Sequence, residues 1–387
     1  MFVKHLTLSH FRNHKNSELT FEKGVNLLVG PNGMGKTNVV EAIEYLSTLS
    51  SHRVAGYQPL IAKDVAGALV RLKVSHQDRD VIVDFELNRD TANQLRINGS
   101  TSNRMRDVLG IVQTVVFAPE DLDIVKRDPS NRRSFIDQLV IQFAPRMAGV
   151  IADYERVLKQ RNTLLKTARI TKTSGSALST LDAWDESLIK YGVEMIQVRL
   201  EVLEKIAPHL KAAYAAIAVA NNNPAVLYKS SLLGNQVVDD TEDAELEFLE
   251  ITKTNEVEDF YRQKLAAVRN KELERGITLV GPHRDDLVLL LGDLPAKGYA
   301  SHGESWSYAL ALKLASAELL KSESKTGDPI IVLDDVFAEL DAGRRDRLAE
   351  LVSENEQVFI TAAVAEDVPS SLKATVFEVE NGVVKRV

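Results

Sequence analysis

The sequence predicts an α/β protein in which a core with buried strands is divided by a long helical insertion. An apolar run at 25–29 resembles a buried strand and leads into a glycine cluster followed by helical spacing. A second apolar run at 330–333 ends in two adjacent aspartates. Between the two runs, residues 121–275 show mainly helical spacing and few strand signals. The fold class follows from these two strand ends and from the helical stretch that separates them.

The composition indicates a chain with a sizeable core. It has 387 residues, of which 44% are hydrophobic and 26% charged, which is enough for two or three domains. The absence of cysteine excludes disulfides and cysteine-ligated zinc. We expect no membrane span, because the longest apolar stretch, 212–220, is far shorter than the roughly 20 residues that cross a bilayer. A cytoplasmic location is expected because the lack of cysteine fits a reducing compartment and the first residues do not resemble a secretory signal. Since the net charge is −8, nucleic acid must be bound through local basic patches.

The first 117 residues are expected to be rich in strands. Residues 3–8 alternate between apolar and polar, residues 81–87 are mostly apolar, and Asn98-Gly99 is typical of a tight hairpin turn. Strand signals return from Gly276 onward. We therefore predict three parts: a strand-rich N-terminal part at 1–120, a helical insertion at 121–275, and a C-terminal part at 276–387 in which strands return.

The glycine cluster at 30–37 reads GPNGMGKT and matches G-x-x-x-x-G-K-[ST] between a strand and a helix. Glycines allow successive amides to point at phosphate oxygens, and the positive end of the helix adds to the field. We expect Lys36 to reach the β and γ phosphates and the Thr37 hydroxyl to bind Mg²⁺. The predicted nucleotide-binding residues are Gly30, Pro31, Asn32, Gly33, Met34, Gly35, Lys36 and Thr37.

A phosphate-binding loop also needs a carboxylate on a neighbouring strand to hold the metal. The run PIIVL at 329–333 is followed by Asp334 and Asp335. We predict that Asp334 is the metal-side carboxylate and that Asp335 orients or deprotonates water. Because Lys36 and Asp334 lie far apart in the sequence, a large insertion must separate them, which is unusual for simple kinases and GTPases.

The segment Ser301-His302-Gly303-Glu304 opens an Ala/Leu-rich helix. It has the form of a capping box, in which Ser301 caps the helix and Glu304 reaches back to it. The Ser301 hydroxyl, the Gly303 amide and the helix N-terminus would also form a second phosphate clamp. The two interpretations are compatible with each other.

With these three elements in this order, the chain resembles the ABC-type ATPases of the SMC and Rad50 class, and within it the RecF family of bacterial DNA repair proteins. The resemblance covers nearly the whole chain. It implies an ATP-binding head of two lobes, a P-loop core with an antiparallel β subdomain, and an inserted helical arm. Besides the P-loop, the segments that carry it are FRNH (11–14), SHR (51–53), VFAPEDLDIVKRDPSNRRSFID (116–137), GPHRDD (281–286), SHGE (301–304) and LDDVFAELD (333–341).

The resemblance implies an ATP-dependent DNA-binding protein of replication, recombinational repair and the SOS response. Such proteins favour gapped or junction DNA, hydrolyse ATP slowly with Mg²⁺, and act with RecR and RecO to place RecA on single strands. They form a homodimer around two nucleotides, in which Ser301 and Gly303 of each chain would complete the partner's site. The implied catalytic residues are Lys36, Ser301 and Asp335.

Some positions depart from the patterns of relatives. Glu304 stands where many carry Gln, so its role stays open. Asp335 stands where transporter ATPases have Glu, and its shorter reach implies weak base catalysis. Thr361 follows the strand at 357–360, where transporters have a switch histidine, so the γ phosphate must be sensed differently. The Q-loop residue is either Gln113 or Glu120.

DNA contacts are expected from basic side chains, since neutralising phosphates carries sequence-independent binding. Four basic residues between 126 and 133 are the first choice for these contacts. The run 156–172 is the second choice, because it has six basic residues and no acidic one. The His283–Asp286 segment has the composition of a metal cluster, but we predict a structural or arm-positioning role for it. The first-choice DNA-binding residues are Lys126, Arg127, Arg132 and Arg133.

Other classes fit less well. Base deamination, suggested by the His302-Gly303-Glu304 sequence, needs a cysteine pair that the chain lacks. A small-molecule kinase is disfavoured by the wide split between the nucleotide motifs. The closest alternative is a structural SMC or Rad50-like ATPase, whose long coiled coil requires sustained heptads. Here the inserted segment is short and its periodicity is broken at 171–180.

Overall fold

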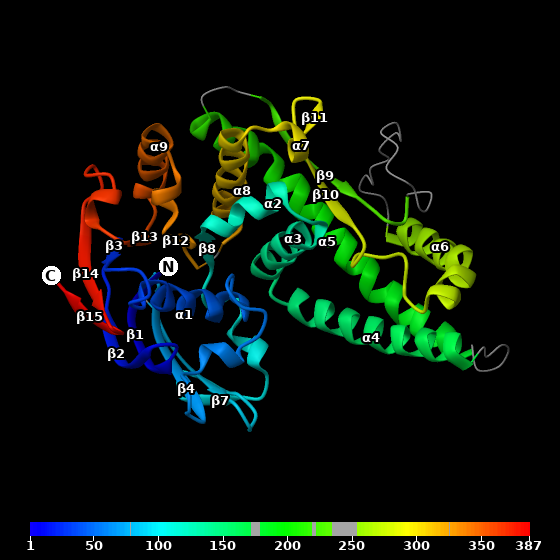
Figure 1. Ribbon diagram of the computed structural model, residues 1–387. Helices are drawn as coiled ribbons and strands as arrows, with labels where there is room; N and C mark the ends of the chain where they lie inside the picture. Colours follow the sequence, from blue (N-terminus) through cyan, green and yellow to red (C-terminus); the bar gives the residue numbers. More distant parts are fainter. Residues whose placement is uncertain (78, 172–178, 219–221, 234–253, 325) are drawn as a thin grey trace. The chain divides into compact units, whose positions relative to one another are not determined.

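The computed structural model describes residues 1–387 except 78, 172–178, 219–221, 234–253 and 325, so most of the predicted break at 171–180 lies outside the described residues. The chain forms two compact units, labelled by element in Figure 1. The first contains 1–125, 208–223 and 300–387, and the second contains 126–207 and 224–299. The predicted division at 120 and 275 into head and arm domains remains a proposal.

An antiparallel sheet of six strands forms one part of the first unit, in the order β2-β1-β4-β5-β6-β7. Val3, Leu6 and Leu8 are buried, as expected for a sheet with one covered face, and the register shift between Val3 and His5 accounts for the three-residue step from Val3 to Leu6. The Asn98-Gly99 turn joins its last two strands with both residues at positive φ, which confirms the predicted tight hairpin. The strands are β1 (Phe2–Phe11), β2 (His14–Thr20), β4 (Gly67–His76), β5 (Arg79–Asn88), β6 (Gln94–Ile97) and β7 (Ser100–Ser102).

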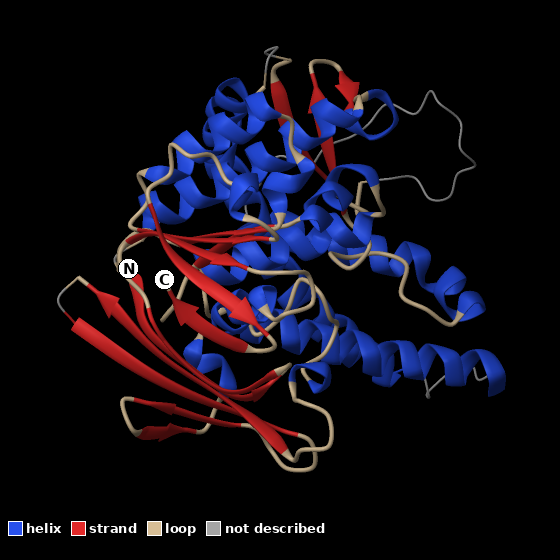
Figure 2. Cartoon of the chain, turned by 60° about the vertical axis from the view of Figure 1, so that its left-hand side comes forward, coloured by secondary structure: helices blue, strands red, loops and turns tan. Residues whose placement is uncertain are grey.

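A second six-stranded sheet holds the two strand ends that were predicted to carry nucleotide chemistry. Its order is β15-β14-β3-β13-β12-β8, and all strands except β15 run parallel. Figure 2 shows helices packed against the strands. Near-continuous apolar runs such as 330–333 are fully buried, as is typical of parallel strands. The strands are β3 (Gly24–Val29), β8 (Thr114–Phe117), β12 (Ile330–Asp334), β13 (Gln357–Ala362), β14 (Ala374–Glu380) and β15 (Val383–Arg386).

The register of this sheet brings distant sequence segments to one edge. Asp334 at the end of β12 pairs with Thr361 of β13, and Ala362 pairs with Val29, the last residue of β3. Because the strands are parallel, their carboxyl ends meet, and the segments that follow them share that edge. The glycine cluster after Val29 therefore lies at the same edge as Asp334.

Helix α1 (Lys36–Thr48) follows the glycine cluster and contacts both sheets of the first unit. It packs on β8, β12 and β13, while the Tyr45 ring meets Phe85 of β5 edge-on with centroids 5.7 Å apart. Further helices of this unit are α2 (Leu122–Lys126), which lies in it up to Val125, α8 (His302–Glu323) and α9 (Ala342–Ser353), with short 3₁₀ helices at Gln58–Leu60, Met105–Val108, Pro119–Asp121, Val336–Glu339 and Ala365–Asp367.

The second unit is mainly helical and carries a small antiparallel sheet in the order β11-β10-β9. Helix α5 (Ser179–Ile217) contains Pro208, where its residues pass into the first unit. No helix within the described ranges is both long and apolar enough to span a bilayer. The remaining elements of this unit are α3 (Pro129–Phe143), α4 (Met147–Thr171), α6 (Thr254–Arg275), α7 (Ala296–Tyr299), β9 (Pro224–Lys229), β10 (Asp286–Leu291) and β11 (Leu294–Pro295).

One arginine of the basic run 156–172 lies inside the core of the second unit. Arg161 is 0% exposed and donates to Asp185 Oδ1 at 2.6 Å, Glu272 Oε2 at 2.7 Å and Thr278 Oγ1 at 2.9 Å. Burial raises the pKa of Glu272, although the charge of Arg161 opposes the change. A buried arginine held by two carboxylates ties three segments of the unit together. Arg161 is therefore not a surface cation in this fold.

Candidate nucleotide site

The glycine cluster forms a loop between β3 and α1 whose conformation depends on glycine. Gly33 and Gly35 adopt φ values of 82° and 114°, which side chains rarely tolerate. Gly35 also caps α1 without a side-chain hydrogen bond. The first amides of a helix have no intrahelical acceptor, and in the described part of the chain no acceptor is found for the amides of Gly33, Gly35, Lys36 and Thr37. The loop therefore offers a group of free donors to an anion.

The Lys36 side chain curls back across this loop. Its Nζ donates to Gly30 O at 2.7 Å, Pro31 O at 3.3 Å and Asn32 Oδ1 at 3.4 Å, and the residue is only 3% exposed. Each of these acceptors is neutral, so the ammonium charge is not balanced by a carboxylate within this set of contacts. A buried cation beside free amides is suited to a phosphate chain.

Asp334 lies across from this loop and is joined directly to α1. Its Oδ1 accepts from the Thr37 hydroxyl at 3.0 Å and from the Thr361 hydroxyl at 2.6 Å. Burial alone would raise the pKa of Asp334, but hydrogen bonds from His52, Thr361 and Thr37 lower it, so the carboxylate stays charged. The Thr37 hydroxyl and an ionised carboxylate are hard oxygen ligands of the kind that Mg²⁺ takes beside phosphates. The residues present fit the predicted metal.

Asp335 differs from its neighbour in backbone and in protonation. It has a φ of 51°, unusual for a residue with a side chain, and its amide donates to the Thr361 hydroxyl at 3.0 Å. Burial and the nearby charge of Asp334 raise the pKa of Asp335, partly opposed by Lys36. A carboxylate with a raised pKa is a better proton acceptor than an ordinary one. The single hydroxyl of Thr361 thus holds both acidic residues where transporters have a histidine.

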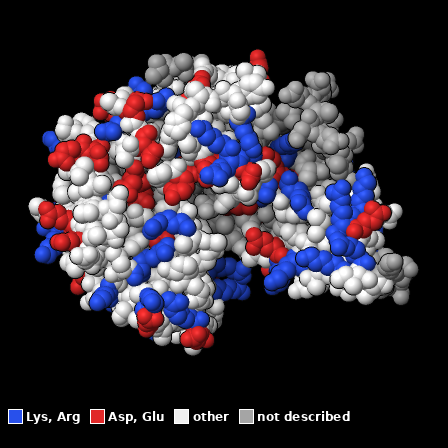
Figure 3. Space-filling view, in the orientation of Figure 1, with Lys and Arg blue, Asp and Glu red and all other residues white. Residues whose placement is uncertain are grey.

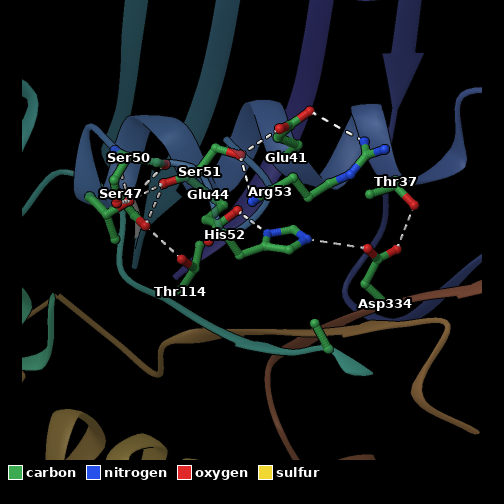
Figure 4. A network of polar contacts seen from close by, with 12 residues as sticks. Thr37, Glu41, Glu44, Ser47, Ser50, Ser51, His52, Arg53, Thr114 and Asp334 are labelled. Carbon is green, nitrogen blue, oxygen red and sulfur yellow. Dashed lines mark hydrogen bonds and ion pairs between the residues drawn. The ribbon is translucent and has the colours of Figure 1, made fainter. Parts of the chain in front are cut away.

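His52 is a member of the site that sequence reasoning did not assign. Figure 4 shows its ring between two carboxylates, with Nδ1 2.6 Å from Glu44 Oε2 and Nε2 3.5 Å from Asp334 Oδ2. Burial would lower the pKa of His52, but hydrogen bonds and charge attraction from Asp334 and Glu44 raise it to about 10. The imidazolium form is therefore the stable one at neutral pH. The SHR segment was the only signal in the sequence.

Two of the segments that carry the resemblance contact Glu41, a buried carboxylate of α1. Glu41 is 0% exposed and accepts from Arg12 Nε at 2.8 Å, Arg12 Nη2 at 2.6 Å and the Ser51 hydroxyl at 2.5 Å. Arg12 belongs to FRNH and Ser51 to SHR. Glu41 therefore fixes both segments against the helix that follows the P-loop.

The predicted capping box at the start of α8 is confirmed. Ser301 Oγ accepts from the Glu304 amide at 3.2 Å, and Glu304 Oε2 accepts from the Ser301 amide at 2.8 Å. Glu304 Oε1 also accepts from Asn222 Nδ2 at 2.8 Å. Hydrogen bonds from Ser301 lower the pKa of Glu304. Glu304 is thus a capping residue, and the phosphate-clamp role of Ser301 remains a proposal.

Gly303 has a steric role at the same helix start. A Cβ atom added there would lie 2.7 Å from Arg344 Nη2. Arg344 also donates from Nε to Ser307 Oγ at 3.0 Å and forms an ion pair with Asp341. The guanidinium therefore connects the start of α8 to the start of α9, and Gly303 leaves room for it. Ser301 makes its hydrogen bonds within the start of its own helix.

The sheet separates the two candidates for the Q-loop. Gln113 directly precedes β8, so it lies at the amino edge. Glu120 follows β8 in the 3₁₀ helix Pro119–Asp121, beyond the carboxyl edge. Since β8 and β12 run parallel, Glu120 lies at the edge that carries Asp334, and Gln113 lies at the opposite one. The sheet topology therefore favours Glu120 over Gln113 as the Q-loop residue.

The predicted DNA-binding residues have different surroundings. Arg132 is 4% exposed and donates to both carboxylate oxygens of Asp286, at 2.7 and 2.9 Å, so it is a structural residue rather than a surface cation. Arg133 donates to the Asp285 carbonyl at 2.9 Å and is partly exposed. Lys126 and Arg127 are exposed. Figure 3 shows further Lys and Arg side chains over α4 and α6, interspersed with acidic ones.

The GPHRDD segment is hydrogen-bonded within the second unit, and its Asp285 is buried. His283 Nδ1 lies 2.7 Å from the Tyr154 hydroxyl, and burial lowers the pKa of His283 to about 3. Asp285 accepts from the Tyr228 hydroxyl and from the Ser231 amide, both at 2.6 Å. The described residues contain no group of three or more acidic or histidine side chains that could hold a metal. This supports the predicted structural role.

Fold and site together define a P-loop ATPase head of the SMC type with a helical insert. The sequence model of the RecF/RecN/SMC N terminal domain matches residues 2–385. An SMC head domain derived from Pyrococcus furiosus shares the fold, with a TM-score of 0.53 at 17% identity over 100% of this chain and 96% of that one. The predicted fold class is confirmed.

Within this class, the chain belongs to the RecF family. It is 50% identical over 384 residues to the DNA replication and repair protein RecF of Leifsonia xyli subsp. xyli, covering 99% of each chain. It is 51% identical over 393 residues to that of Streptomyces avermitilis, covering 100% of each. A solved structure of the recombination mediator protein RecF-ATP in the RecFOR pathway has a TM-score of 0.87 at 30% identity, covering 100% of this chain and 97% of that one.

Proposed function

We propose that this chain is an ATP-dependent DNA-binding protein of recombinational repair, and that ATP acts as a clasp between two copies of it. The observation that carries the proposal is the convergence of Lys36, Thr37, Asp334 and Asp335 at one edge of the parallel sheet. The RecF relative solved with ATP supports the choice of nucleotide. Lys36 and the loop amides would hold the triphosphate, and Thr37 with Asp334 would hold Mg²⁺.

Hydrolysis at this site is expected to be slow. When bound, Mg²⁺ would offset the negative charge of the β and γ phosphate oxygens. Asp335 would then accept a proton from the attacking water, which its raised pKa favours. Its side chain is one methylene shorter than Glu, and its backbone is fixed by the Thr361 hydroxyl, so it has little freedom to follow the water. Cleavage would release the clasp.

The dimer is proposed from the start of α8. Ser301 and His302 are exposed, and Ser301 makes its hydrogen bonds within its own helix start, which leaves the helix N-terminus open to a phosphate from outside the chain. Each chain has one P-loop and one such clamp. Two copies facing each other would complete two sites.

The variant Ser301→Arg tests this clamp. We expect it to bind ATP with wild-type affinity but to remain monomeric, because a long cation at the helix start would block a partner's phosphates. Analytical ultracentrifugation with ATP, next to nucleotide titration, measures both properties. Ser322→Arg, placed in the last turn of the same helix, is the matched control and should dimerise. An ATP-dependent Ser301→Arg dimer would exclude the clamp.

DNA is the proposed macromolecular partner, with gapped or junction duplex preferred and with RecR, RecO and RecA as functional partners. Arg133, Lys126 and Arg127 remain proposed phosphate contacts, whereas Arg132 does not. Fluorescence anisotropy of a gapped duplex should show binding that requires ATP and weakens steeply with salt. Equal binding without nucleotide would contradict the proposal.

The alternative function, a structural SMC or Rad50-like ATPase, is less well supported. Its long arm would require an extended antiparallel coiled coil. The longest helix of the described chain, α5, has 39 residues, and the helices of the second unit pack around a buried arginine. We therefore prefer an ATP-dependent DNA-binding protein with a short helical arm over an ATPase with a long coiled coil.

A further inference from the structure

Two consecutive carbonyls of the P-loop are held from behind by residues remote in sequence. Met34 O accepts from the Gly382 amide and from Asn13 Nδ2, both at 2.9 Å. Gly35 O lies 3.0 Å from His14 Nε2. Since a carbonyl oxygen only accepts, Nε2 must carry the proton of the imidazole. The back of the loop is thus hydrogen-bonded to the segment after β1 and to the turn between β14 and β15.

These contacts determine where the amides of the loop point. In a trans peptide the C=O and the following N–H point in opposite directions. Fixing Met34 O on the rear side therefore turns the Gly35 amide toward the front. Gly35 O is held by His14 together with the Val39 amide of α1, which turns the Lys36 amide the same way. Both amides are among those without a protein acceptor. The rear hydrogen bonds orient the donors that a phosphate would meet.

The rear contacts form one connected group. His14 is 0% exposed, and its Nδ1, which carries no proton when Nε2 does, lies 2.9 Å from the Ser17 hydroxyl. The same hydroxyl lies 2.9 Å from Gly382 O. A Cβ atom added to Gly382 would lie 2.5 Å from Asn13 O. The backbone of the turn therefore approaches the segment after β1 as closely as only glycine allows.

We propose that Asn13, His14 and the Asn381-Gly382 turn are positioning residues for phosphate binding. They act through the Met34 and Gly35 carbonyls and do not touch the nucleotide. The C-terminal hairpin is thereby part of the nucleotide site, although it lies more than 300 residues from the P-loop in sequence. The inference rests on the proposed ATP binding and assigns part of its affinity to this hairpin.

The chain contains a matched control for the hairpin turn. Asn98-Gly99 and Asn381-Gly382 are both two-residue Asn-Gly turns, with glycine φ values of 82° and 76°. A Cβ atom on Gly99 would meet nothing within 4 Å, whereas one on Gly382 would meet Asn13 O. Alanine therefore introduces the same backbone strain at both positions. Only at Gly382 does it also displace the P-loop contact.

The experiment compares Gly382→Ala with Gly99→Ala by ATP titration, steady-state ATPase kinetics and thermal unfolding. We expect Gly382→Ala to lose more stability than Gly99→Ala, because only its Cβ atom meets Asn13 O, and only Gly382→Ala to weaken ATP binding, by about tenfold for two disturbed hydrogen bonds. Its KM for ATP should rise while kcat at saturating ATP is unchanged. Equal ATP affinity of the two variants would overturn the inference.

A second variant covers the case in which Gly382→Ala does not fold. Asn13 is exposed, so Asn13→Ala removes one donor to Met34 O without disturbing the core. It should raise the KM for ATP about fivefold with kcat unchanged, and a wild-type KM would contradict the proposal. A wild-type protein that does not bind ATP would instead refute the proposed function, so the two failures are distinguishable.

Discussion

The variant Lys36→Ala is expected to lose ATP binding by roughly 100-fold or more, the scale of a buried charge-assisted contact. The ammonium is almost completely buried and is held by neutral acceptors of its own loop, which a triphosphate would replace with charged ones. Alanine removes the only cation contributed by the P-loop itself. Isothermal titration with ATP and Mg²⁺ measures the effect.

The control for this variant is Lys15→Ala. Lys15 is exposed on β2 of the same unit, so its removal should change neither folding nor nucleotide affinity. The unfolding midpoint of Lys36→Ala without nucleotide should stay near that of the wild type, since the acceptors of Lys36 found among the described residues are all neutral. Tight ATP binding by Lys36→Ala would show that the P-loop is not the nucleotide-binding site.

The second large effect is expected for Asp335→Asn, which should retain ATP and accumulate as an ATP-bound dimer. Asparagine preserves the size of the side chain but cannot accept the proton, and loss of a general base typically costs about 100-fold or more in rate. Its amide hydrogen bond to Thr361 is made by the backbone and is unaffected. Single-turnover phosphate release measures the loss.

Asp334→Asn provides the comparison, because it should weaken Mg²⁺-dependent binding rather than the chemical step alone. The Asp334 carboxylate accepts from Thr37 and Thr361 and is kept charged by its hydrogen bonds. If Asp335→Asn hydrolyses ATP at the wild-type rate, Asp335 has no part in the chemistry. The adjacent pair would then share a structural role only.

Sequence reasoning succeeded where the signal is local. The P-loop, the capping box of Ser301 and Glu304, and the Asn98-Gly99 turn are each defined by residues within a few positions of one another. Their geometry follows from glycine at positive φ and from helix ends that need partners. The strand that ends in Asp334 was likewise recognisable from its continuous apolar run.

It failed where the partner is remote. Arg132 and Arg161 resembled solvated cations, but their carboxylates at Asp286 and Glu272 lie more than 100 residues away. His52 could not be assigned because its contact with Asp334 exists only where the segment after α1 lies against the end of β12. Such pairings depend on sheet register and helix packing, which spacing within one segment does not reveal.

The central claim is that ATP joins two copies of this chain, and its most direct test is the molar mass of the wild-type protein in solution. Multi-angle light scattering with ATP and Mg²⁺ should give twice the monomer mass of 42.9 kDa, and the monomer mass without nucleotide. Adding a gapped duplex should stabilise the dimer. A wild-type protein that binds ATP and yet stays at the monomer mass, with or without DNA, would contradict the account.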